Sequence, residues 1–129
     1  MLLAIDAGNT QLKMAVFTND TLKDSTFLQY DDNKFEDTFK KWLSKDITKI
    51  GLVSVKGNAF LEKVNSYIKH TISFVDMTYK FPFEIKYNSP KTLGIDRIVA
   101  CAGAYALNNQ EGNLMVIDAG TAITYDVVN

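Results

Sequence analysis

The chain has 129 residues, of which 47% are hydrophobic and 22% are charged, and this is enough apolar material for the core of one domain. Its 14 basic and 15 acidic residues give a net charge of −1, which excludes a broad electrostatic footprint for nucleic acid, and no basic tract marks a membrane surface. Cys101 is the only cysteine, so neither an internal disulfide nor a cysteine cluster for a metal can form. We expect Cys101 to be a buried residue of a helix, and the protein to be soluble and cytoplasmic, without a secretory signal or a membrane span.

The chain opens with three predicted strands. Residues 2–5 form an apolar run typical of a strand that is buried on both faces, and residues 11–18 alternate loosely after a Gly-Asn-Thr turn. A second turn at Asn19 and Asp20 leads into a strand over 21–28. We therefore expect an antiparallel arrangement of these three segments.

Strands then alternate with helices. Apolar residues at i, i+4, i+7 and i+8 from Phe35 predict a helix with Trp42 in its core-facing stripe and Asp31 or Asp32 as its N-cap. The order of the elements predicts an α/β layer with a mixed sheet. The other predicted elements are a strand over 50–55, a helix capped by Asn58 and ending near His70, a strand over 72–75, an edge strand over 81–87 interrupted by Pro82, a helix from Ile95 to about residue 106, and strands over 114–117 and 123–128.

Two segments of the chain echo each other. Residues 4–10 read AIDAGNT and residues 116–122 read VIDAGTA, and a second apolar strand follows each copy. Their separation is far longer than the roughly 20–50 residues of solenoid repeats, so it indicates a duplicated domain. We predict a first domain over 1–112 and the opening hairpin of a second, similar domain over 113–129, cut short in a fragment. Such a hairpin would expose an edge and an apolar face, unless a tight dimer covers them.

Each Asp-Ala-Gly turn is suited to phosphate. A glycine such as Gly8 permits a tight turn and a close approach of phosphate, and successive N–H groups with the Thr10 hydroxyl form an anion-binding concavity. Asp6 and Asp118 would repel a phosphate unless a cation lies between them, which implies Mg²⁺. Lys13 can reach the same phosphates as a point charge. One such turn is usually an ordinary hairpin, but two copies with the same flanking pattern favour phosphate binding.

A second candidate site lies at the start of the helix that begins near Ile95. An aspartate is favoured there by the helix dipole, so Asp96 alone fits an ordinary helix start, whereas Arg97 opposes the dipole and indicates an anion nearby. Neighbouring residues on a helix point in different directions. Asp96 and Arg97 can therefore contact a hydroxyl and a carboxylate of one small substrate, with Asp96 accepting the hydroxyl proton.

Four motifs follow one another along the chain: Asp6-Ala7-Gly8-Asn9-Thr10, Tyr87-x-x-Pro90, Gly94-x-Asp96-Arg97 and Asp118-x-Gly120-Thr121-Ala122. In this order and spacing they resemble the type III pantothenate kinases, members of the actin, hexokinase and sugar-kinase superfamily, along nearly the whole chain. The resemblance implies a ribonuclease-H-like (actin-like ATPase) domain with a mixed sheet and flanking helices. It also implies ATP-dependent phosphorylation of the primary hydroxyl of pantothenate, the first step of coenzyme A biosynthesis, in a homodimer that binds neither nucleic acid nor membrane.

The resemblance also implies roles for individual residues. They are ATP binding by Asp6, Ala7, Gly8, Asn9, Thr10, Gln11, Leu12, Lys13 and Thr121, pantothenate binding by Tyr87, Gly94, Ile95, Asp96 and Arg97 with Asp96 as the catalytic proton acceptor, and a monovalent cation, potassium or ammonium, on Asp118.

Two other interpretations remain open. One is a kinase of another small hydroxy acid, against which Gly94-x-Asp96-Arg97 argues because it is the most family-specific motif. The other is a non-catalytic, nucleotide-binding regulator of the same fold, although Asp96 and Asp118 are both present. Because the glycine-rich segments that complete the nucleotide site in the family are not in this chain, we expect the fragment itself to bind ATP weakly and to be poorly active or inactive.

Overall fold

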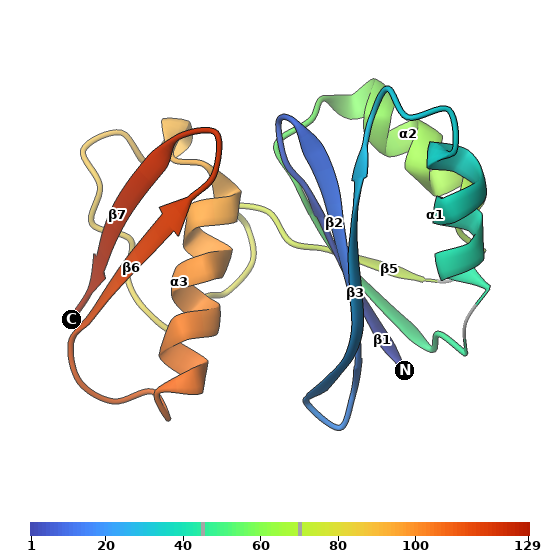
Figure 1. The fold of residues 1–129 in the computed structure, drawn as a ribbon. Coiled ribbons are helices and arrows are strands. Elements are labelled where there is room, and N and C mark those ends of the chain that lie inside the picture. The colour runs from blue at the N-terminus through green and yellow to red at the C-terminus, as the bar shows by residue number, and fades with distance from the viewer. Residues whose placement is uncertain (45, 70) are drawn as a thin grey trace. The chain divides into compact units, whose positions relative to one another are not determined.

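The computed structural model describes residues 1–44, 46–69 and 71–129, which form two compact units, 1–75 and 76–129 (Figure 1). His70, at the end of a predicted helix, lies outside the described residues. The boundary predicted between residues 112 and 113 separates two copies of a duplicated domain rather than two compact units, and it stays a prediction.

The first unit contains a five-stranded mixed sheet. Strands β1 (Leu2–Ala7), β2 (Gln11–Thr18) and β3 (Thr21–Gln29) form an antiparallel meander. Strand β4 (Lys49–Ser54) pairs with β1 in parallel, and β5 (Ile72–Phe74) pairs with β4 in parallel. The strand order is β3-β2-β1-β4-β5, so the predicted α/β class with a mixed sheet is confirmed.

Helices α1 (Phe35–Leu43) and α2 (Asn58–Tyr67) cover one face of this sheet (Figure 1). Phe39 of α1 and Val64 of α2 are almost fully buried against alternate residues of β1 and β2. Trp42 belongs to this core, as predicted. The apolar run at the start of the chain was expected to be buried on both faces, but β1 alternates and Leu2 is 41% exposed, because both helices lie on one side only.

The predicted helix caps are wrong. The N-cap of α1 is Lys34 and that of α2 is Gly57, neither with a side-chain capping bond. The carboxylate of Asp32 instead accepts a hydrogen bond from the N–H of Lys34 at 2.8 Å, a local turn two residues long that precedes the helix. Asn58 is the first residue of α2 rather than its cap.

The second unit begins with irregular chain where an edge strand was predicted. No strand forms over 81–87, and a short 3₁₀ turn, η1 (Pro90–Thr92), follows. Contacts between aromatic rings join this segment to the next helix instead. The ring of Phe81 lies 6.2 Å from that of Phe83, which in turn lies 6.2 Å from Tyr105 of the next helix.

Helix α3 (Ile95–Leu107) packs on an antiparallel hairpin of β6 (Leu114–Ala119) and β7 (Ile123–Val128). Cys101 of α3 is buried, as predicted. The opposite face of the hairpin is open, since large apolar side chains on it are 57–65% exposed: Met115, Ile117, Ile123, Tyr125 and Val127. The apolar face expected of this hairpin is therefore present, whereas the second, truncated domain stays a prediction. No helix in the described part of the chain is both long and apolar enough to cross a bilayer.

Candidate functional site

The turn between β1 and β2 has the geometry of a tight, braced hairpin. The N–H of Gly8 donates to the carbonyl of Gln11 at 3.1 Å, and a Cβ on Gly8 would lie only 3.3 Å from that oxygen, so a larger residue would be crowded. Asp6 and Lys13 face each other across the two strands, with Nζ and Oδ2 3.9 Å apart. Four residues predicted to bind ATP phosphates thus meet at one end of the hairpin.

Other predicted ATP residues belong to the core. The side chains of Ala7 and Leu12 are fully buried, so they can offer a nucleotide only backbone groups. The Gln11 side chain accepts a long hydrogen bond, 3.5 Å, from Gln29 on β3. The part of the hairpin that can meet a phosphate directly is therefore the turn itself and the Asp6–Lys13 pair.

Two residues that the sequence analysis missed hold this turn. The hydroxyl of Tyr30 donates to the carbonyl of Gly8 at 2.9 Å, and Nζ of Lys56 donates to the carbonyl of Asn9 at 2.6 Å. The same ammonium lies 4.5 Å from the Tyr30 ring centre. Burial, together with the charge of Asp6, raises the pKa of Tyr30 to about 12.

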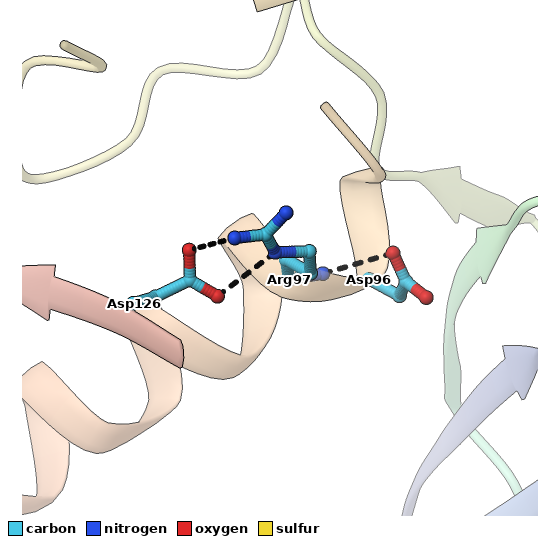
Figure 2. A network of polar contacts seen from close by, with 3 residues as sticks. All are labelled: Asp96, Arg97 and Asp126. Atoms are coloured by element: carbon cyan, nitrogen blue, oxygen red, sulfur yellow. Dashed lines mark hydrogen bonds and ion pairs between the residues drawn. The ribbon is translucent and has the colours of Figure 1, made fainter. Parts of the chain in front are cut away.

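Helix α3 starts with the predicted substrate motif. Gly94 is its N-cap and Ile95 its first residue, and the Asp96 carboxylate folds back to accept the N–H of Arg97 at 3.0 Å. A Cβ on Gly94 would overlap Oδ1 of Asp96, so the glycine leaves the space that this carboxylate occupies. Figure 2 shows the side chains of Asp96 and Arg97 diverging, as expected of neighbours on a helix.

The anion that an arginine in a first turn indicates is present within the chain. Asp126 of β7 accepts two hydrogen bonds from Arg97, at 3.0 Å from Nε and 2.6 Å from Nη2 (Figure 2). The two side chains are 23% and 18% exposed, so the pair is largely withdrawn from water. The hydrogen bond to Asp126 raises the pKa of Arg97 above its usual value. Asp126 carries no local motif and was not predicted from the sequence.

A cavity of about 230 Å³ lies beside this ion pair within the second unit. The guanidinium carbon of Arg97 lies 5.7 Å from the ring centre of Tyr87, so two predicted pantothenate residues meet here, while Asp96 does not line the cavity. Burial raises the pKa of the Cys101 thiol, which keeps it protonated at neutral pH. Residues that line the cavity include Tyr87, Leu93, Arg97, Ile98, Cys101 and Asp126.

The second Asp-Ala-Gly turn joins β6 and β7. The N–H of Gly120 donates to the carbonyl of Ala122 at 3.0 Å, and Thr121 is exposed in the turn. Asp118 is paired in register with Thr124, whose buried hydroxyl has no hydrogen-bond partner among the described residues. Within the ranges the structure describes, no three or more His, Cys, Asp or Glu side chains gather as a metal cluster.

These features define an α/β protein with a mixed sheet and two Asp-Ala-Gly hairpin turns. A family model described as type III pantothenate kinase matches residues 2–129. The chain is 37% identical to a type III pantothenate kinase of Flavobacterium johnsoniae, covering 100% of the chain and 52% of the relative. It is 35% identical to one of Flavobacterium psychrophilum (100% and 53%) and 39% identical to one of Christiangramia forsetii (98% and 52%).

The chain belongs to the type III pantothenate kinase family, and the predicted resemblance is confirmed. It spans about half the length of the curated relatives it matches.

Proposed function

We propose that the intact protein is a transferase that moves the terminal phosphoryl group of ATP to the primary hydroxyl of pantothenate, the first step of coenzyme A biosynthesis. The observation that carries the proposal is the family match over residues 2–129. The substrate motif at the start of α3 supports it, because Asp96 and Arg97 present a carboxylate and a guanidinium in different directions.

In this proposal the first hairpin holds the ATP phosphates. Phosphoryl transfer depends mainly on positioning and on neutralising charge. The turn at Gly8 supplies backbone N–H groups, and Lys13 supplies a positive charge beside Asp6. Thr121, in the second turn, would contact ATP from the other hairpin.

Asp96 would act as the proton acceptor. Its Oδ1 accepts the N–H of Arg97, which orients the carboxylate and leaves Oδ2 for the pantothenate hydroxyl. A positioned base of this kind contributes about 10²- to 10⁴-fold to the rate. Gly94 and Ile95 would approach pantothenate through the backbone at the helix start.

Arg97 would bind the pantothenate carboxylate while Asp126 holds the Arg97 guanidinium in position. Asp126 uses the Nε and Nη2 edge of the guanidinium, and an arginine carries five N–H donors, so the other edge remains for a substrate. Tyr87, beside the guanidinium, would form a wall of the pocket. If this is correct, Asp126→Asn raises KM for pantothenate; if Asp126 competes with the substrate, KM falls.

The proposal includes two cations. Mg²⁺ would neutralise phosphate charge with carboxylate help from Asp6, since it binds few protein carboxylates and keeps phosphate and water ligands. Potassium or ammonium would bind Asp118. The buried hydroxyl of Thr124 has no hydrogen-bond partner in the described part of the chain and lies opposite Asp118 in register, which fits the oxygen ligands that hard cations prefer.

The architecture of the intact protein is also part of the proposal. Residues 1–112 would form a ribonuclease-H-like domain, and residues 113–129 the opening hairpin of a second one. The open apolar face of β6 and β7 and the greater length of the relatives support this reading. We further propose a homodimer that supplies part of the pantothenate pocket, acts in the cytoplasm, and binds neither nucleic acid nor membrane.

The test is ADP release by the intact gene product with ATP, pantothenate, Mg²⁺ and potassium. We expect turnover that requires potassium and falls at least about 100-fold in Asp96→Asn. Asp20→Asn, in an exposed turn, makes the same chemical change elsewhere and should leave the rate unchanged. No turnover from a folded wild type would contradict the proposal and favour a regulatory relative, while turnover only with another hydroxy acid would change the acceptor.

A further inference from the structure

Two side chains from different elements grip the backbone of the first Asp-Ala-Gly turn. Tyr30 lies just after β3 and donates to the carbonyl of Gly8 at 2.9 Å. Lys56 lies just after β4 and donates to the carbonyl of Asn9 at 2.6 Å. The two consecutive carbonyls of the turn are thus both held, one by a hydroxyl and one by an ammonium.

The grip fixes where the turn's N–H groups point. In a planar trans peptide the C=O and the following N–H point in opposite directions. Holding the carbonyls of Gly8 and Asn9 therefore turns the N–H groups of Asn9 and Thr10 away from Tyr30 and Lys56. Two successive N–H groups on one side of a turn are the basis of an anion-binding concavity.

Both gripping residues are themselves well supported. The Tyr30 ring packs edge-on against Phe60, with centroids 5.3 Å apart, and at 5.8 Å from Phe35. The N–H of Lys56 donates to the hydroxyl of Ser54 at 3.0 Å, which sets the bend after β4. Support of this kind is what keeps a site within the narrow tolerance that positioning requires.

The chemistry of the pair also suits a polyanion. The ammonium of Lys56 lies 4.5 Å from the Tyr30 ring centre, a cation–π arrangement that keeps the positive charge beside the turn. With its pKa raised to about 12, Tyr30 stays protonated at neutral pH and remains a donor.

We propose that Tyr30 and Lys56 are positioning residues that orient the backbone N–H groups of the β1–β2 turn toward the phosphates of ATP. This inference rests on the proposed function and adds two residues to its nucleotide site. They act through the turn, so their loss should weaken ATP binding without altering the acceptor site.

The experiment measures KM for ATP, KM for pantothenate and kcat for the intact protein and its variants. We expect Tyr30→Phe and Lys56→Met each to raise KM for ATP by about 5- to 30-fold, the effect of losing one such hydrogen bond, with KM for pantothenate changed less than twofold. Lys56→Arg keeps a donor and a charge, so it should restore KM for ATP to within about threefold of wild type.

Matched controls make the same chemical changes at exposed positions. Lys41→Met on α1 and Tyr79→Phe remove an ammonium and a hydroxyl whose residues are exposed, and KM for ATP should stay at the wild-type value. Melting temperatures identify a variant that has simply lost its fold; if Lys56→Met does so, Tyr30→Phe, which removes a single hydroxyl, decides.

The outcomes separate the two proposals. If the wild type turns over but Tyr30→Phe and Lys56→Met keep a normal KM for ATP, the inference is wrong and the proposed function stands. The same holds if KM for ATP and KM for pantothenate rise by equal factors in the variants. If the wild type shows no turnover, the proposed function fails, and calorimetric titration with ADP then tests the grip directly. Tight ADP binding lost in both variants would support it, and equal or absent binding in all would overturn it.

Discussion

The ion pair of Arg97 and Asp126 offers the sharpest test of the second unit. Changing Asp126 to Asn keeps the size and shape of the side chain but removes its charge. One amide oxygen still accepts a hydrogen bond, while the amide nitrogen now faces a guanidinium that can only donate. The change therefore removes the opposite charge and one of the two hydrogen bonds that Arg97 donates to this side chain.

The burial of the pair sets the magnitude. The Arg97 and Asp126 side chains are 23% and 18% exposed. Removing one partner of a fully buried pair costs about 3–5 kcal/mol, whereas an exposed pair contributes about 0–1 kcal/mol. Since this pair is mostly buried but touches water, we expect Asp126→Asn to lower the free energy of unfolding by about 2 kcal/mol.

Urea unfolding of the intact protein measures this effect. A double-mutant cycle with Arg97→Met isolates the coupling between the two side chains, which we expect to be about 1–2 kcal/mol. Asp20→Asn, an exposed turn residue at φ 60°, is the matched control and should stay within about 0.5 kcal/mol of wild type. A coupling energy below about 0.5 kcal/mol would refute the argument from burial.

Four further results are expected. Gly94→Ala should lower kcat at least about tenfold by displacing the Asp96 carboxylate, whereas Gly103→Ala, with open space around it in α3, should stabilise by about 0.4–1 kcal/mol in urea unfolding. Phe39→Ala, at 1% exposure, should cost about 3–5 kcal/mol in the same assay. Because the pKa of Tyr30 is raised from 10.0 to about 12, its protonated form stabilises the fold below pH 10, and roughly 2–3 kcal/mol should be lost between pH 10 and 12; this loss should be absent in Tyr30→Phe.

Local pattern was enough to predict most elements. Apolar runs and alternation located β2 at residues 11–18, and the aromatic stripe located α1 from Phe35. The exception is informative. Phe81, Phe83, Ile85 and Tyr87 alternate like a strand, but a strand also needs a neighbouring strand for its backbone hydrogen bonds. Here the ring of Phe83 instead meets Tyr105 of α3 edge-on.

Some residues of the candidate site could likewise be predicted from local pattern, and others could not. Gly8 and Gly94 could be predicted because each stands in a short motif whose spacing carries the chemistry. Tyr30, Lys56 and Asp126 could not, because each acts on a residue 22, 47 or 29 positions away in the chain. Such partners are set by strand pairing, which local spacing does not encode.

The parallel pairing of β1 with β4 has a consequence for how the chain folds. The β1–β2 hairpin is local and can form within microseconds, but the bond from Lys56 to Asn9 spans 47 residues, and long-range parallel pairing is intrinsically slow. The β1–β2 turn therefore forms early, and the hydrogen bond from Lys56 to Asn9 forms only when β4 pairs with β1. A nucleotide that needs the braced turn would bind the finished sheet in preference to any intermediate, and would hold β4 in place against unfolding.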